Sequence, residues 1–159
     1  MNKFPIYLIL LISFCSFSLP EKSFSKGDLT RQKPIQIDVF LSGKIGESHY
    51  YKPSVLKFET GKLYKLILHN NSDSKHYFTS SNFSNSIFTR KVQIIKDDKK
   101  IAEVKGKIDN IEVFPNNKVE WWLVPIRTGK FNDLFCEVKD KETGAVHADM
   151  GMKGQIIIE

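Results

Sequence analysis

Residues Phe131–Ile158 read FNDLFCEVKDKETGAVHADMGMKGQIII and hold the most informative pattern in the chain. An apolar run ends near Cys136, a polar loop follows, and a second apolar run closes the stretch. Short apolar runs on either side of a loop rich in Gly and Asp predict two β-strands. Cysteine, histidine and methionine therefore follow one another on a single strand–loop–strand unit, at Cys136, His147 and Met150 or Met152.

Further short apolar runs precede this unit and are separated by turn-forming Gly, Pro, Asn and Asp. Alternation of this kind is typical of an antiparallel sandwich. The prediction is an all-β fold, a Greek-key β-sandwich or barrel, forming a single domain over residues 35–159. The expected strands are Pro34–Leu41, Val55–Glu59, Leu63–Leu68, Lys91–Ile95, Ile111–Phe114, Val119–Val124, Phe131–Val138 and Gln155–Ile158. Residues 80–89 are predicted to form a short helix or a loop, and residues 96–107 a solvated hairpin rim.

The first 25 residues have the composition of a secretory signal. Lys3 precedes an uncharged apolar run, Ile6–Cys15, and small residues follow, which together predict export. The run is short of the roughly 20 apolar residues that span a bilayer, so no stable membrane insertion is expected after cleavage. An uncleaved anchor and lipidation at Cys15 are the alternatives. The expected location is the periplasm or the extracellular space, and residues 26–34 are predicted to be a flexible lead-in.

Removal of the signal would leave Cys136 without an intramolecular disulfide partner. One interpretation is a buried, inert thiol. The other is a metal ligand, because a thiolate, imidazoles and a weak thioether are the ligands of a mononuclear electron-transfer copper. Zinc is a further alternative, although a zinc site would more often recruit additional Cys, His or carboxylate side chains.

A second imidazole must come from another part of the chain. His76 follows a strand and a turn, and is therefore the expected ligand. His69 lies within a strand pattern and is expected to belong to a sheet. His49 lies in a Gly- and Ser-containing segment before Pro53 and is expected at the surface. Met152 is preferred to Met150 as the thioether, with Met150 as the alternative axial ligand.

The region Val55–Glu159 resembles the plastocyanin and azurin branch of the cupredoxins. The matching segments are Phe58-Glu59-Thr60-Gly61-Lys62, Leu68-His69-Asn70, His76-Tyr77-Phe78, Gly129-Lys130-Phe131 leading to Phe135-Cys136, and His147-x-x-x-Gly151-Met152-x-Gly154. The resemblance implies a secreted β-sandwich with one type 1 copper ion held by His76, Cys136, His147 and axial Met152. The sequence departs from the family in one place. Ten residues, Glu137–Val146, separate Cys136 from His147, where the family has only a few, and so long a loop is expected to admit water or loosen the site.

The leading functional hypothesis is a copper-binding protein that transfers one electron at a time and is not an enzyme. Its expected partner is another redox protein, which would dock on the apolar surface around His147. The alternative is a periplasmic copper-delivery protein that holds Cu(I) through Cys136, Met150 and Met152 and meets a copper-handling partner. A third hypothesis is an interaction domain without metal. A net charge of +6 without an Arg/Lys block argues against nucleic acid as a partner, and a monomer is expected.

Overall fold

The structure, a computed structural model, describes residues 28–97 and 99–159. The predicted signal segment, residues 1–25, lies outside the described residues. A short 3-10 turn, Leu29–Arg31, precedes a chain of strands that contains one helical turn. The elements are β1 (Ile35–Gly43), β2 (His49–Lys52), β3 (Val55–Phe58), β4 (Tyr64–Asn70), β5 (His76–Thr79), α1 (Ser81–Ser84), β6 (Ile87–Lys96), β7 (Lys99–Val104), β8 (Asn110–Val113), β9 (Asn117–Pro125), β10 (Gly129–Phe135) and β11 (Lys153–Ile158).

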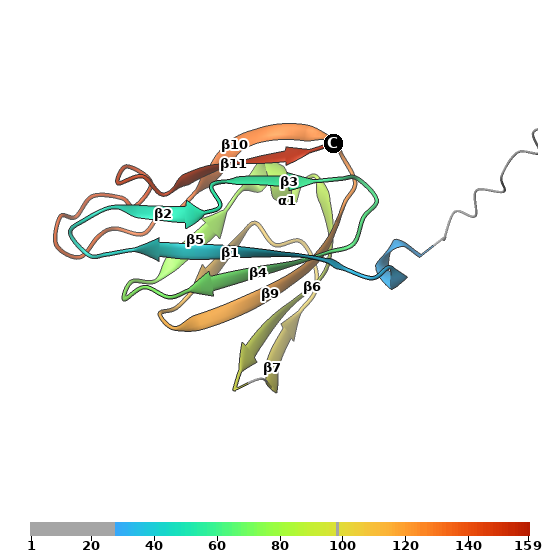
Figure 1. The fold of residues 1–159 in the computed structure, drawn as a ribbon, viewed down its shortest axis with the longest axis horizontal. Helices are drawn as coiled ribbons and strands as arrows, with labels where there is room; N and C mark the ends of the chain where they lie inside the picture. The colour runs from blue at the N-terminus through green and yellow to red at the C-terminus, as the bar shows by residue number, and fades with distance from the viewer. Residues whose placement is uncertain (1–27, 98) are drawn as a thin grey trace, which may run out of the picture.

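The strands form two sheets that pack face to face (Figure 1). The six-stranded sheet has the order β2-β1-β4-β9-β6-β7, and the five-stranded sheet has the order β3-β11-β10-β5-β8. Most neighbours are antiparallel, but β1 pairs with β4 and β11 pairs with β3 in parallel. The predicted all-β sandwich is confirmed.

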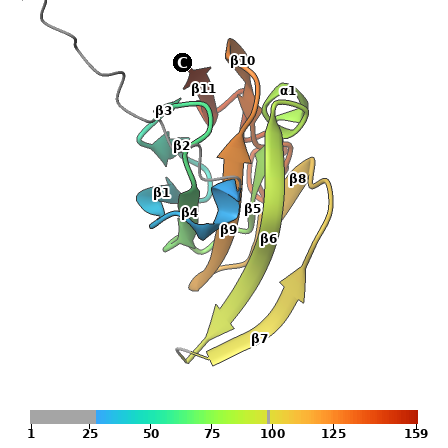
Figure 2. The same cartoon turned by 90° about the vertical axis from the view of Figure 1, so that its right-hand side faces the viewer.

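Two strands were not expected from the sequence, and a third lies where a charged hairpin rim was predicted. β2 (HYYK) and β5 (HYFT) have four residues each and lack the aliphatic side chains that marked the equally short β3 and β8. β7 forms a hairpin with β6 that extends beyond the rest of the six-stranded sheet (Figure 2), in the region predicted as a charged hairpin rim. Of residues 80–89, only α1 is helical, and its Ser80 cap accepts a hydrogen bond from the Phe83 amide.

Aromatic side chains fill the space between the sheets. Trp121 on β9 meets Phe78 and Phe83 edge to face, with ring centroids 6.3 and 5.6 Å apart. Phe58 packs on Phe83 at 5.2 Å. Burying each such ring is worth roughly 2–3 kcal/mol, and the interlocking rings fix the two sheets relative to each other.

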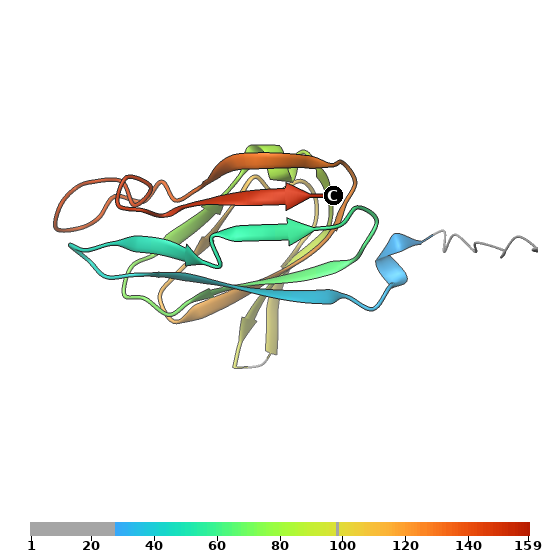
Figure 3. The same cartoon turned by 45° about the horizontal axis from the view of Figure 1, so that its top comes forward.

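Three connections meet at one end of the sandwich, seen at the left of Figures 1 and 3. They are the β1–β2 turn, the β4–β5 turn and the long segment between β10 and β11. The candidate metal ligands lie on or beside these connections. In the described part of the chain, no helix has the length and apolar character needed to cross a membrane.

Candidate metal centre

Cys136 directly follows β10 and is completely buried. Its backbone amide donates to the Met152 carbonyl at 3.2 Å, which ties it to the start of β11. Its sulfur accepts a hydrogen bond from the Tyr77 amide on β5 at 3.3 Å. The thiol is therefore fixed from both neighbouring strands.

His76 is the first residue of β5, so the structure places it at the strand end and not in the preceding loop. Its Nδ1 lies 3.9 Å from the Cys136 sulfur. Its Nε2 lies 2.8 Å from the Ser72 hydroxyl, whose own proton can go to the Ser74 carbonyl or Asn70 Oδ1. Donation from Nε2–H to Ser72 leaves the Nδ1 lone pair directed at the sulfur.

His147 lies at the end of the long connection and is also completely buried. Its Nδ1 is 3.1 Å from Nδ1 of His76 and 3.7 Å from the Cys136 sulfur. Its Nε2 is buried and has no hydrogen-bond partner among the described residues. The His147 imidazole is therefore enclosed by the protein and does not reach the surface.

The three donor atoms form a triangle with sides of 3.1, 3.7 and 3.9 Å. A point equidistant from all three lies about 2.1 Å from each, within the range of about 2.0–2.3 Å at which imidazole nitrogen and thiolate sulfur bind a metal ion such as zinc. Two imidazoles and a thiolate in a trigonal arrangement are the donor set of an electron-transfer copper site. The side chains therefore fit the metal that the sequence predicts.

The two candidate thioethers have different surroundings. Met152 is completely buried and belongs to the same core cluster as Cys136, and its amide donates to the His147 carbonyl at 2.9 Å. Met150 is only half-buried, and its sulfur accepts from the Thr143 hydroxyl at 3.6 Å. This placement favours Met152 as the thioether of the cluster.

A third imidazole joins the cluster. His49, expected at the surface, is completely buried, and that expectation is wrong. Its ring stacks on His147 with centroids 3.6 Å apart and an interplanar angle of 14°, and its ligand atom lies within 4.8 Å of those of His76 and His147. The available signal was the alternation of residues 49–52, whose first and third side chains face inward.

The long loop between Cys136 and His147 is ordered. Lys139 and Val146 form an isolated antiparallel bridge, and the Asp140 amide donates to the Ala145 carbonyl at 2.8 Å. The Asp140 carboxylate accepts from the amides of Glu142 and Thr143 at 3.0 and 2.8 Å. The loop folds back on itself, and the side chains of His76, Cys136, His147 and Met152 are completely buried.

Burial sets the protonation of the donors. It lowers the pKa of His76 to about 3, with His147 and His49 as further causes. It lowers the pKa of His147 to about 4, assisted by His49 and opposed by Asp140. Burial raises the pKa of the Cys136 thiol, against the amides of Tyr77 and Val138. At neutral pH the imidazoles of His76 and His147 are therefore neutral, and the Cys136 thiol is protonated.

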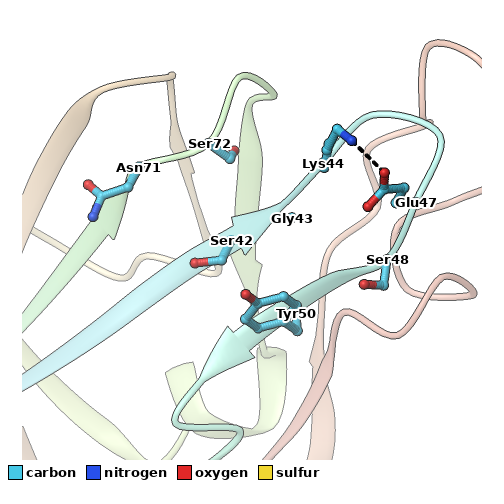
Figure 4. Close-up of a pocket in the computed structure, with 8 residues that line it drawn as sticks. All are labelled: Ser42, Gly43, Lys44, Glu47, Ser48, Tyr50, Asn71 and Ser72. Carbon is cyan, nitrogen blue, oxygen red and sulfur yellow. Dashed lines mark hydrogen bonds and ion pairs between the residues drawn. The ribbon is translucent and has the colours of Figure 1, made fainter.

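A polar hollow of about 300 Å³ lies along the β1–β2 turn (Figure 4). Ser72, the hydrogen-bond partner of His76, lines it, and so does Gly43, above which His49 Nδ1 lies. Its other lining residues are Ser42, Lys44, Glu47, Ser48, Tyr50 and Asn71. The lining thus includes residues next to the cluster but none of the proposed ligands.

No family model matches the sequence, and no curated protein matches it. Solved structures do resemble it. A copper nitrite reductase from Nitrosomonas europaea superposes with a TM-score of 0.57 at 8% identity, over 85% of this chain and 52% of that one. A laccase from Pediococcus acidilactici superposes with a TM-score of 0.56 at 17% identity, over 80% of this chain and 27% of that one. A multicopper oxidase from Campylobacter jejuni superposes with a TM-score of 0.54 at 18% identity, over 80% of this chain and 30% of that one.

The chain thus spans between about a quarter and a half of the length of these proteins. At such low identity the likeness concerns the fold alone. Two curled sheets in this order, together with these neighbours, show that the described part of the chain has a cupredoxin-like β-sandwich fold.

Proposed function

We propose that this chain binds one copper ion through His76, Cys136 and His147, with Met152 as the thioether ligand, and acts as a one-electron carrier. The observation that carries the proposal is the buried triangle of two Nδ1 atoms and one sulfur, with sides of 3.1, 3.7 and 3.9 Å. Copper bound there would supply the one-electron couple between Cu(I) and Cu(II).

The protein contributes orientation and the exclusion of water. The Tyr77 amide holds the sulfur, and Ser72 selects the tautomer of His76 that leaves Nδ1 free. The Cys136, His147 and Met152 backbones are linked to one another by hydrogen bonds. A donor set fixed in this way changes little in geometry when the charge of a bound ion changes, which favours rapid electron transfer.

The delivery alternative would require Met150 to act beside Cys136 and Met152. The Met150 sulfur lies against the Thr143 hydroxyl, so delivery would need the loop to rearrange. Complete burial of the ligands also supports a carrier over an enzyme, because it leaves no ligand edge exposed to a substrate. Export to the periplasm or the extracellular space, a redox protein as partner and a monomeric state are parts of the same proposal.

The absorption spectrum of the purified protein with Cu(II) tests the proposal. We expect a strong thiolate-to-copper band in the visible region that disappears on reduction and returns on reoxidation. Tight Cu(I) binding without such a band would favour delivery. A protein that binds copper in neither oxidation state would refute both functions.

Variants of single ligands identify the donors. Cys136→Ser should abolish the visible band while the far-UV circular dichroism of the fold is retained. Met152→Leu should shift the band and the reduction potential. Met150→Leu is the matched control, because Met150 is a nearby thioether outside the buried cluster, and it should leave both unchanged. A band that survives Cys136→Ser would exclude this sulfur as the ligand.

A further inference from the structure

His49 is a buried histidine that the proposed ligand set does not use. It begins β2, and its ring covers one face of the His147 ring at 3.6 Å, nearly parallel. It meets His76 edge to face at 5.4 Å. The imidazole of one proposed ligand is thus in contact with a second, independent imidazole.

Asp140, in the middle of the long loop, holds His49. Its Oδ2 lies 3.2 Å from His49 Nε2, and both side chains are completely buried. The same carboxylate accepts hydrogen bonds from the Gly46 amide at 3.0 Å and from the Thr143 amide and hydroxyl at 2.8 and 3.0 Å. The Thr143 and Gly46 amides, together with the His49 ring and the Thr143 hydroxyl, keep the pKa of Asp140 well below its usual range, so the group is a carboxylate that accepts from Nε2–H.

The backbone also connects His49 with the segment that follows His147. The His49 amide donates to the Met150 carbonyl at 3.3 Å. A Cβ on Gly151 would lie 3.1 Å from the His49 carbonyl oxygen, so the two segments approach closely. The start of β2 is therefore joined to the His147–Met152 segment through its main chain, and to the long loop through its side chain.

We infer that His49 is a positioning residue of the metal centre, which holds the His147 imidazole in place by stacking, and that Asp140 in turn holds His49. The inference rests on the proposed function. Ligand histidines are oriented by contacts outside the coordination sphere, and losing such contacts typically costs about 10–100-fold in metal affinity. The ten-residue loop then has a role: it carries Asp140 to His49 and fixes the site.

The experiment compares four variants of the full chain loaded with Cu(II). His49→Ala removes the stacked ring, and His49→Phe keeps a flat ring without ring nitrogens. Asp140→Ala removes the anchor. His69→Ala is the matched control, because His69 is also stacked on an aromatic ring, Phe40, and bonded to a carboxylate, Asp38, outside the cluster. The readouts are the visible spectrum, Cu(II) affinity and pulsed electron paramagnetic resonance, which counts bound nitrogens.

We expect His49→Ala and Asp140→Ala to shift the visible band and to weaken Cu(II) binding about 10–100-fold. His49→Phe should keep the wild-type visible band. His69→Ala should change neither the band nor the Cu(II) affinity. Pulsed electron paramagnetic resonance of the wild type should show two coordinated imidazoles. Near-UV circular dichroism of each metal-free variant verifies the fold. If His49→Ala fails to fold, the visible spectra and Cu(II) affinities of His49→Phe and Asp140→Ala test the inference.

Two results would overturn the inference while leaving copper binding intact. One is a wild-type band and affinity in both His49→Ala and Asp140→Ala. The other is a third coordinated nitrogen that both His49 substitutions remove, which would make His49 a ligand. A wild-type protein that binds no copper would instead refute the proposed function, so the two failures are distinguishable.

Discussion

The metal-free cluster has a defined protonation state. His76 and His147, with pKa values of about 3 and 4, are neutral at pH 7. The Cys136 thiol, whose pKa is raised by burial, keeps its proton. Only the sulfur therefore has to lose a proton when a metal ion binds, because the imidazole lone pairs are already available.

Copper binding at pH 7 should release one proton per ion. The proton comes from Cys136, so Cys136→Ser should release none. Calorimetric titration in two buffers with different heats of ionisation measures the number. Release of two or more protons would show that an imidazole is charged before binding.

Acid should destabilise the metal-free protein. The folded pKa values of His76 and His147 lie below the unfolded value of 6.5, so the unfolded state binds more protons. Stability is then complete above about pH 6.5 and falls as pH drops toward 4, by on the order of 1 kcal/mol per pH unit for each imidazole. Urea unfolding at pH 7, 6 and 5 tests this. His76→Phe should reduce the slope by about half, and a slope unchanged by it would contradict the assignment.

At the level of elements, the β1–β2 hairpin carries His49 and depends on the glycine that ends β1. Gly43 has a φ of +152° and stands opposite His49 in the strand pairing. A Cβ at this position would lie 2.2 Å from His49 Nδ1. His49 can therefore lie this close to the end of β1 because Gly43 has no side chain.

Gly43→Ala should destabilise the protein by about 2–4 kcal/mol, since it combines backbone strain with a collision. Gly61→Ala is the matched control: its φ is +73°, but nothing lies within 4 Å of an added Cβ. It should cost only about 1 kcal/mol, the strain alone. Denaturant unfolding of the metal-free variants gives both values. Equal losses of stability in the two variants would show that the collision with His49 contributes nothing.

At the level of the whole molecule, the net charge is +6, and cationic side chains gather on the six-stranded sheet. Lys65, Arg90 and Lys91 surround the Trp122 ring, at 5.7, 5.8 and 4.9 Å from its centroid. Such a charge speeds encounters with anionic partners, and salt screens it over about 10 Å at 0.1 M.

Oxidation of the Cu(I) protein by an anionic reagent such as hexacyanoferrate should therefore slow as ionic strength rises. A cationic cobalt complex should show the opposite trend. Stopped-flow measurement of the visible band from 10 to 200 mM salt follows both reactions. Identical salt dependence for the two reagents would contradict steering by the overall charge.

The pattern of short alternating runs and turn residues was enough to predict the β-sandwich, because most of its strands carry an apolar alternation that can be read locally in the sequence. Cys136, His147 and Met152 were predicted together for the same reason: they lie within one strand–loop–strand unit. His76 was proposed from its position after a turn, and the structure brings it to the cluster at the first residue of β5.

The placement of His49 was decided only by the tertiary structure. Its strand has four residues, and Asp140, which holds it, lies 91 positions away along the chain. The sequence likewise showed the long loop as an insertion but not its hairpin. A contact between two such distant side chains leaves no periodic trace, because it depends on how the hairpin and the loop meet at the end of the sandwich. The sequence by itself determined the fold class and the chemistry of the donors. The folded chain decided that the donors are enclosed and which residues hold them in place.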